Sequence, residues 1–413
     1  MISLKKMLFV FALSACILSV SANPIHLDKS INSILNPLIG DNDVVYVSVD
    51  GTGDGSSPNS PLGSMKQALN ISKPNGIIKV SNGVYKGIEH TGIMIDKNIT
   101  IEGDSDTVFD GGKINFIFMA NGQGLNVNVS NIKFKNAYSQ HGPGYHGYAS
   151  VNHLKNCVFE DNTADAGAGA TGFSNAVAVL ENCTFKGNSA DQFAGATSSW
   201  VGSNVTLIKC VYENNTVNKD GACIRATGSQ LTVIDTTFKN NQAGINGIIH
   251  ADENAEVNII NTIFANNSAD FGGAIYIDNA KLNVLNSEFN DNEASNGGAI
   301  SINGKSNANI SNSIFTNNSA DGNGGAINME DGVLSVDNSK FVSNFAKTRG
   351  AGIYNHRGKF TINGTDFDGN CLTTDTGVYY MGGGAIFNDL GNDSTITRSK
   401  FNDNKANKAG GAI

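Results

Sequence analysis

The stretch VNIINTIFANNSADFGGAIYIDNA (residues 257–280) returns in altered form as LNVLNSEFNDNEASNGGAISINGK (residues 282–305). Each copy holds an aromatic residue, an Asn three places later and then a Gly-Gly-Ala-Ile segment. The aromatic position recurs eleven times, at intervals of 25 to 27 residues with a final interval of 34: Phe134, Phe159, Phe185, Tyr212, Phe238, Phe264, Phe289, Phe315, Phe341, Phe367 and Phe401. A period this regular predicts a solenoid of stacked units rather than a globular domain.

Within one unit, the residues before the aromatic alternate in character. The residue five places before the aromatic, Ile259 in the unit of Phe264, is aliphatic in every unit. The residue two places before it, Thr262 in this unit, is small in all units but one. This pattern predicts a strand with one buried face. Asn261 and Asn267, three places before and after the aromatic, predict two corners, because Asn tolerates left-handed backbone.

The Gly-Gly-Ala-Ile segment predicts the remaining turn and a third short strand. Three strands and three corners in roughly 26 residues describe one rung of a right-handed parallel β-helix, an all-β fold. Leucine-rich repeats share this period, but they need a Leu-x-x-Leu-x-Leu pattern and a second leucine-bearing flank. Here the second half of each unit holds Ala, Gly, Asp and Ser, which favours the β-helix.

The composition fits a turn-rich β-structure. Charged residues make up 16% of the chain, which holds 48 Gly and 6 Pro and has a net charge of -9. The four arginines, Arg225, Arg349, Arg357 and Arg398, form no basic stripe. Nucleic acid and anionic membrane surfaces are therefore not expected partners.

The N-terminus has the layout of a secretory signal peptide. Lys5 and Lys6 precede an apolar run that ends at Val20, and cleavage is expected after Ala22. Leu13 to Cys16 offer an alternative, because they resemble a bacterial lipoprotein box. Either route exports the chain, and no transmembrane segment is expected in the mature protein.

Five cysteines remain after that cleavage. Cys157, Cys183 and Cys210 occupy one column on three consecutive rungs. A disulfide between stacked neighbours would be strained, because their side chains point along parallel directions. We interpret the column as buried thiols that replace Ser or Thr. No pair of cysteines has metal-ligand spacing, so neither a metal nor a cofactor is expected.

The chain divides by its repeats into four segments: 1–22 as signal peptide, 23–43 as linker, 44–125 as N-terminal cap and first rungs, and 126–413 as regular repeats. Within the third segment, residues 61–70 predict a short amphipathic helix with Met65, Ala68 and Leu69 on one face. Such a helix would cover the open edge of the first rung. The last unit ends in mid-rung at Ile413, which indicates truncation.

Two groups of motifs carry a family resemblance. The Tyr46-Val-Ser-Val-Asp-Gly-Thr-Gly-Asp-Gly segment and the Asn82-Gly-Val-Tyr85 and Asn98-Ile-Thr-Ile-Glu-Gly103 segments resemble the head of adhesin-like surface proteins of methanogenic archaea. The Phe-x-x-Asn and Gly-Gly-Ala-Ile motifs resemble repeats of chlamydial polymorphic outer membrane proteins. This resemblance implies an extracellular β-helix that displays surfaces for cell contact, with cell-surface glycans or proteins as partners.

Two places interrupt the repeat and are candidate ligand contacts. The first is the Gly-rich segment with His141, Tyr145, His146 and Tyr148, whose rings could stack on sugars or bind a metal. The alternative is a loop that leads into the regular rungs. The second place is the longer unit before Phe401, with Tyr379 and Tyr380, which could instead pack against the solenoid.

The function expected is that of a secreted or cell-surface adhesin-like protein, not an enzyme. Pectate lyases and related glycan-cleaving enzymes share the β-helix, so a carbohydrate-active enzyme is the first alternative. The recurrent acids Asp165, Asp191, Asp270 and Asp321 follow Asn-x-Ala in a corner, which is typical of turn residues rather than of a catalytic pair. A passive structural protein of the cell envelope is the second alternative.

Overall fold

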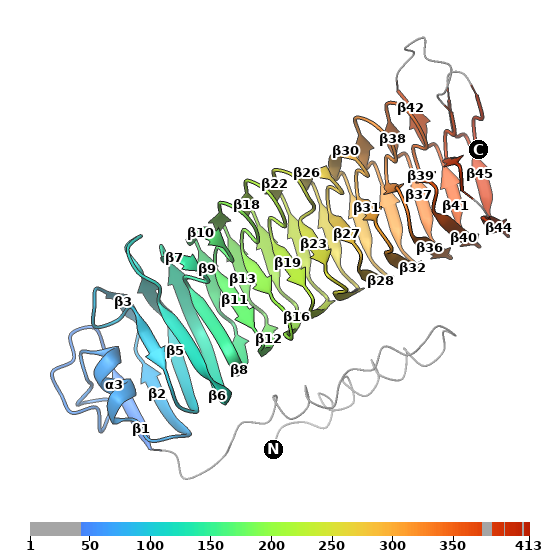
Figure 1. Ribbon diagram of the computed structural model, residues 1–413. Helices are drawn as coiled ribbons and strands as arrows, with labels where there is room; N and C mark the ends of the chain where they lie inside the picture. Colours follow the sequence, from blue (N-terminus) through green and yellow to red (C-terminus); the bar gives the residue numbers. More distant parts are fainter. Residues whose placement is uncertain (1–42, 374–381, 392, 407–408) are drawn as a thin grey trace, which may run out of the picture. The chain divides into compact units, whose positions relative to one another are not determined.

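The computed structural model describes residues 43–373, 382–391, 393–406 and 409–413. They form a right-handed parallel β-helix, as the repeats predict (Figure 1). Strands of one rung pair in parallel and in register with those of the next, so that Phe264 lies over Phe289 and Phe289 over Phe315. Like residues therefore stack along the solenoid axis.

Each regular rung contains four strands, not the three that the sequence predicts. In one rung these are β27 (Ile275–Asp278), β28 (Lys281–Leu285), β29 (Glu288–Asn290) and β30 (Glu293–Asn296). The first three belong to a 35-stranded sheet, and the fourth belongs to a separate ten-stranded sheet. The additional strand arises because the residues after the corner are extended and bury their alanine, Ala294 in this rung, against the interior.

The four strand positions form four stacks. The first stack comprises β8 (Tyr145–Lys155), β11 (Thr171–Ser174), β15 (Thr197–Ser199), β19 (Ile224–Thr227), β23 (Ile249–Asp252), β27, β31 (Ile300–Asn303), β35 (Ile327–Met329), β39 (Ile353–His356) and β43 (Ile386–Asp389). The second comprises β12 (Val177–Glu181), β16 (Asn204–Ile208), β20 (Gln230–Ile234), β24 (Glu256–Ile260), β28, β32 (Asn307–Ser311), β36 (Val333–Asp337), β40 (Lys359–Asn363) and β44 (Thr395–Thr397).

The third and fourth stacks complete the rungs. The third comprises β9 (Val158–Glu160), β13 (Thr184–Lys186), β17 (Val211–Glu213), β21 (Thr237–Lys239), β25 (Ile263–Ala265), β29, β33 (Ile314–Thr316), β37 (Lys340–Val342), β41 (Asp366–Asp368) and β45 (Lys400–Asn402). The fourth comprises β7 (Tyr138–His141), β10 (Thr163–Gly167), β14 (Ser189–Ala190), β18 (Thr216–Val217), β22 (Gln242–Ala243), β26 (Ser268–Phe271), β30, β34 (Ser319–Ala320), β38 (Phe345–Ala346) and β42 (Cys371–Leu372).

The N-terminal part starts the same stacks. Its elements are β1 (Val44–Val47), α3 (Met65–Ile71), β2 (Gly76–Val80), β3 (Gly83–Lys86), β4 (Ile93–Ile95), β5 (Ile99–Asp110) and β6 (Phe118–Lys135). The predicted helix is present and buries Met65, Ala68 and Leu69. It begins at Met65 rather than at residue 61, because the Ser64 hydroxyl accepts a hydrogen bond from the Gln67 amide and caps the helix.

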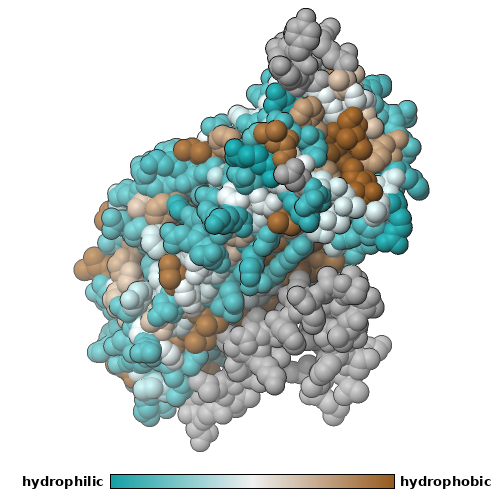
Figure 2. Space-filling model, turned by 45° about the vertical axis from the view of Figure 1, so that its right-hand side comes forward, coloured by the Kyte–Doolittle hydropathy of each residue, from teal (hydrophilic) through white to brown (hydrophobic). Residues whose placement is uncertain are grey.

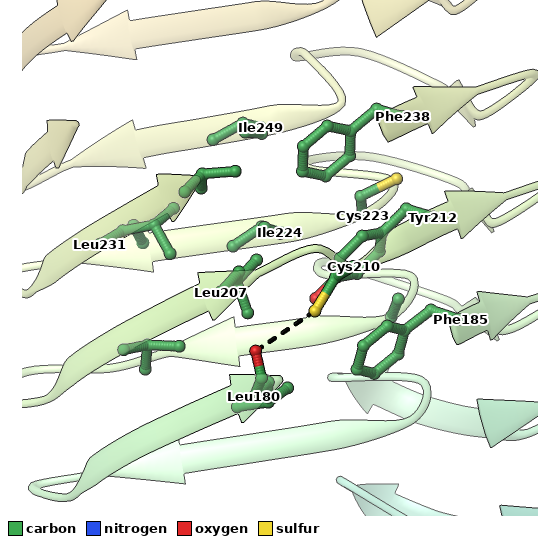
Figure 3. Packing of buried hydrophobic residues seen from close by; sticks show 14 of the residues in the cluster. Leu180, Phe185, Leu207, Cys210, Tyr212, Cys223, Ile224, Leu231, Phe238 and Ile249 are labelled. Carbon is green, nitrogen blue, oxygen red and sulfur yellow. Dashed lines mark hydrogen bonds between the residues drawn. The ribbon is translucent and has the colours of Figure 1, made fainter. Parts of the chain in front are cut away.

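The aromatic residues of the third stack lie on one axis, as predicted. Ring centroids of consecutive rungs are 4.4 to 5.0 Å apart, and the ring planes are within 18° of parallel. Figure 3 shows Phe185, Tyr212 and Phe238 in this arrangement beside the aliphatic residues of the other stacks. Burial of these rings supplies a large part of the apolar contact that holds the rungs together.

The two asparagine columns behave differently. Asn261, like the other asparagines three places before the aromatic, adopts a left-handed conformation and forms the predicted corner. Asn267 does not, because the left-handed residue is its neighbour Asn266. The Asn267 side chain turns inward, where its amide donates to the Phe238 carbonyl and to the Asn292 side chain, at 3.1 and 3.0 Å. The second column is thus a buried asparagine ladder beside the corner rather than the corner itself.

The three cysteines of one column are buried and free, as interpreted from their register. The Cys210 thiol lies 3.3 Å from the Leu180 carbonyl of the preceding rung, the contact drawn in Figure 3. Farther along the same column, hydroxyls replace the thiols, and Ser287 and Ser313 accept hydrogen bonds from backbone amides of the preceding rung. Burial raises the pKa of Cys183 well above its usual value.

Candidate functional site

The outward side of the first stack carries a different side chain on successive rungs, and many of these side chains are polar yet buried. Within β19, Ile224 and Ala226 point into the core, so alternation turns Arg225 outward. Strand register places one residue of every rung at this position. We call this column the outer strip: His146, Gly172, Ser198, Arg225, His250, Tyr276, Ser301, Asn328, Tyr354 and Phe387.

A second column runs beside the outer strip, where the fourth stack turns into the first. We call it the corner stack: Gly167, Phe193, Asp220, Asn246, Phe271 and Asn296. The turn is tight because Gly272 has a φ of 62°, and a Cβ atom there would lie 2.2 Å from the Ile275 carbonyl oxygen. The chain therefore folds back onto the sheet and brings the corner stack against the outer strip.

The middle of the outer strip holds a cluster of charged groups. The Arg225 guanidinium lies 2.7 Å from the Asp252 carboxylate and 3.7 Å from that of Asp220. The His250 ring lies between the same two carboxylates, at 3.9 Å from Asp220 and 3.8 Å from Asp252. Burial lowers the pKa of His250, and the Arg225 charge lowers it further, so the imidazole is neutral at neutral pH.

Several buried polar atoms of this region lack a hydrogen-bond partner within the described residues. They include His250 Nδ1 and Asp252 Oδ1, and farther along the outer strip Ser301 Oγ and Asn328 Oδ1. His250 is 5% exposed and its Nδ1 faces Asp220 from beyond hydrogen-bond distance. Buried polar groups are nearly always paired in folded proteins, so such a run marks a place where water or a ligand completes the bonding.

An exposed aromatic cluster adjoins the charged one. The Phe193 ring lies 5.4 Å from Trp200 and 6.2 Å from His141, measured between ring centroids, and Trp200 is 37% exposed. The Arg225 guanidinium lies 5.2 Å from the centroid of the Phe193 ring and so joins the two clusters. Elsewhere, hydrophilic residues cover most of the face shown in Figure 2, and hydrophobic ones form separate groups.

The candidate contacts predicted from sequence are placed as follows. His141 is part of the aromatic cluster, His146 begins the outer strip, and Tyr148 is 52% exposed. Tyr145 is fully buried, and its hydroxyl donates to the Asn152 side chain at 2.7 Å. Its side chain therefore lies in the core and offers no surface to a ligand.

Three predicted residues lie outside the described part of the chain, namely Tyr379, Tyr380 and the cleavage position Ala22. Within the described ranges, no group of three or more His, Cys, Asp or Glu side chains is placed to hold a metal ion. No helix in the same ranges is long and apolar enough to cross a membrane.

Sequence reasoning missed the charged cluster of Arg225, His250, Asp220 and Asp252. The available signal was the residue that follows the isoleucine of each Gly-Gly-Ala-Ile-like segment. This residue changes from Arg225 to His250, Tyr276 and Ser301 on successive rungs, whereas the columns on either side stay apolar.

Comparison with known families agrees with this architecture. A model described as right-handed beta helix region matches residues 97–248. A model of the Chlamydia polymorphic membrane protein repeat matches residues 261–278 and 312–330. The predicted resemblance to these repeats is thus confirmed over those residues, whereas the resemblance of the N-terminal part to archaeal surface proteins stays a prediction. No curated protein matches the chain.

Solved structures resemble this chain only distantly. Pectate lyase Pel9A is 14% identical, with a TM-score of 0.41, over 67% of this chain and 79% of its own. The Streptococcus pneumoniae surface protein and adhesin PfbA is 11% identical, with a TM-score of 0.32, over 88% and 98%. The PL6 family alginate lyase AlyGC is 11% identical, with a TM-score of 0.27, over 87% and 80%. Likeness at this level indicates no function.

Proposed function

We propose that this chain is a secreted or cell-surface adhesin-like protein that binds cell-surface glycans or proteins through the first stack. The observation that carries the proposal is the outer strip. Its residues change from rung to rung, and several of them hold buried polar atoms that lack a hydrogen-bond partner within the described residues. The match to the polymorphic membrane protein repeat supports a place outside the cytoplasm.

The side chains in and beside the strip suit contact with another molecule. Trp200, Phe193 and Arg225 are of the residue types that dominate binding interfaces, because they combine apolar area with a polar or charged edge. The neighbouring Tyr148 and His141 extend this surface toward the N-terminal rungs. The solenoid below is held by its own ladders, so these side chains are free to serve recognition.

Adhesion of beads coated with the full mature chain to cells tests the proposal. We expect the coated beads to adhere to cells or isolated cell envelopes, and beads coated with the heat-unfolded chain to adhere far less. Excess soluble chain should compete with the coated beads. Absence of competable adhesion across a panel of cell types would refute an adhesive role and favour a passive structural one.

A polysaccharide-cleaving activity is the second candidate, and the observation that favours it is the cluster of Asp220, Asp252, His250 and Arg225. Two carboxylates near a cation and an imidazole are groups that glycan-cleaving enzymes use. Binding remains the first choice because both carboxylates are already engaged by Arg225. Incubation with polygalacturonate and neutral polysaccharides, with and without calcium, followed by assay of reducing and unsaturated ends, tests the activity.

A further inference from the structure

We infer that the outer strip and the adjoining corner stack between Phe193 and Ser301 bind a neutral glycan and discriminate against acidic ones. This inference rests on the proposed function and names the ligand class of the same site. It follows from four features of these rungs: an exposed aromatic platform, an excess of carboxylates, unpaired buried polar atoms and their spacing along the solenoid.

The aromatic platform consists of Phe193 and Trp200, with His141 beside them. Their ring centroids lie 5.4 to 6.2 Å apart, and Trp200 keeps more than a third of its surface in contact with solvent. A half-exposed ring presents an apolar face bounded by polar atoms. This combination fits the C–H face of a sugar ring, which is apolar while its edge carries hydroxyls.

The charges next to the platform determine which net charge a bound ligand can carry. The charges that act on His250 are the carboxylates of Asp220, Asp252 and Asp278 and the guanidinium of Arg225. His250 adds no charge because burial keeps its pKa low. This cluster is therefore negative, and the carboxylates of uronic acids or sulfate groups would be repelled.

A divalent cation is also a poor ligand for these carboxylates. Arg225 lies within 2.7 Å of Asp252 and 3.7 Å of Asp220, so a cation between them would meet the guanidinium charge. Hydroxyl groups do not have this difficulty. They donate to carboxylates and accept from guanidinium or imidazole groups, so a neutral sugar satisfies both kinds of partner.

The unpaired atoms supply the hydrogen-bonding positions. His250 Nδ1 and Asp252 Oδ1 lie beside the ion pair, and Ser301 Oγ lies two rungs farther along the same column as His250. Successive rungs are about 4.8 Å apart. The partners are thus repeated along the solenoid axis, which suits an extended glycan chain lying parallel to that axis more than a single compact sugar.

A binding assay with defined glycans tests this inference. The full chain is titrated with neutral oligosaccharides of glucose, mannose, galactose and N-acetylglucosamine, and with oligogalacturonate and oligoalginate as acidic probes. Trp200 fluorescence and calorimetry report binding. We expect at least one neutral series to bind, with affinity that increases with chain length, and the acidic probes to bind at least about tenfold more weakly.

Variants assign the binding to the aromatic platform beside the strip. Trp200→Ala and Phe193→Leu should each weaken binding by about tenfold, whereas Ile314→Ala and Lys305→Ala should leave it unchanged. Ile314 matches the exposed fraction of Trp200, at 37%, but lies on the third stack. Thermal unfolding midpoints confirm that each variant is folded, and Phe193→Leu keeps the test valid if Trp200→Ala does not fold.

Three results would overturn the inference: no binding of any neutral series, tighter binding of the acidic probes, or equal affinity of the platform variants and the parent chain. The bead adhesion assay separates these failures from failure of the proposed function. Beads that adhere while no neutral glycan binds leave the adhesive role in place and reject this ligand class.

Discussion

The third stack and the outer strip are both columns of stacked residues, yet they differ in one respect. In the third stack an aromatic ring recurs on each rung, with consecutive centroids no more than 5.0 Å apart. In the outer strip Arg225, His250 and Tyr276 follow one another on consecutive rungs. The repeating column satisfies the packing requirement of the solenoid, whereas the outer strip places a different side chain on each rung.

This contrast predicts where substitutions destabilise the molecule. The strongest effect is expected for Phe289→Ala, because the ring is fully buried between Phe264 and Phe315. Its loss should lower the free energy of unfolding by roughly 3 to 5 kcal/mol, measured by denaturant titration. Glu288→Ala changes the exposed residue just before it and should have an effect within about 0.5 kcal/mol. Equal effects of the two changes would contradict the contrast.

The asparagine ladder offers a second comparison, between two adjacent residues. Asn267 is buried, donates two hydrogen bonds and accepts two from Asn241, so Asn267→Ala leaves buried partners unsatisfied. We expect a loss of about 3 kcal/mol in the free energy of unfolding. Asn266→Gly, at the exposed left-handed position, should be nearly neutral, since Gly adopts positive φ readily. Chemical denaturation of both variants distinguishes the inward column from the corner.

Lowering the pH should reduce the stability of the folded chain through His250 of the outer strip more than through the buried ladders. His250 faces Arg225, Asp220, Asp252, Asp278 and Tyr276, and burial lowers its pKa in the folded chain. Below the ordinary value of about 6.5, the unfolded chain binds a proton that the folded chain does not, so stability present at pH 7.5 is lost as the pH falls.

We expect the His250→Gln variant to lose less stability than the parent chain between pH 7.5 and 5, by roughly 1 kcal/mol. Other histidines with lowered pKa values, such as His153, act in the same direction and remain in the variant. Thermal unfolding midpoints across this pH range measure the difference. Identical pH profiles would show that His250 is not held neutral by its surroundings.

The smallest effect is expected within a repeating column. Cys183 occupies the position that holds Ser287 and Ser313 on later rungs, so Cys183→Ser should change the free energy of unfolding by less than about 1 kcal/mol. In the native chain, thiol reagents should leave Cys157, Cys183 and Cys210 unmodified, because all three are buried. Mass spectrometry before and after unfolding measures this reactivity.

The division between repeating and varying columns also separates the features that the sequence predicted from those that it did not. The aromatic, aliphatic and small columns were predictable, because one physical requirement is repeated on every rung. Asn267 was assigned to the corner because spacing alone does not distinguish a left-handed residue from the neighbour that turns inward. The fourth strand was missed because it is only two to five residues long and rich in small residues.

The candidate site was only partly predictable. His141 and Tyr148 were recognised because they interrupt the repeat, and the structure places both at the surface near the N-terminal end of the outer strip. Tyr145 was grouped with them because its strand register, which places it inward, is not visible in the sequence. Arg225 and His250 were overlooked because residues that change from rung to rung leave no signal in an alignment of repeats.

The central claim is that residues at one repeat position lie directly above one another along the solenoid. Spin labels at Thr237 and Asp366, outward positions of the third stack, test this claim most directly, because strand register places five rung steps between them. The buried thiols need no removal, and Cys371→Ser avoids labelling the one half-buried cysteine of the described chain. Pulsed electron resonance should give a narrow distribution with backbone positions about 24 Å apart. A broad distribution, or one centred far from this value, would contradict the stacking and the account built on it.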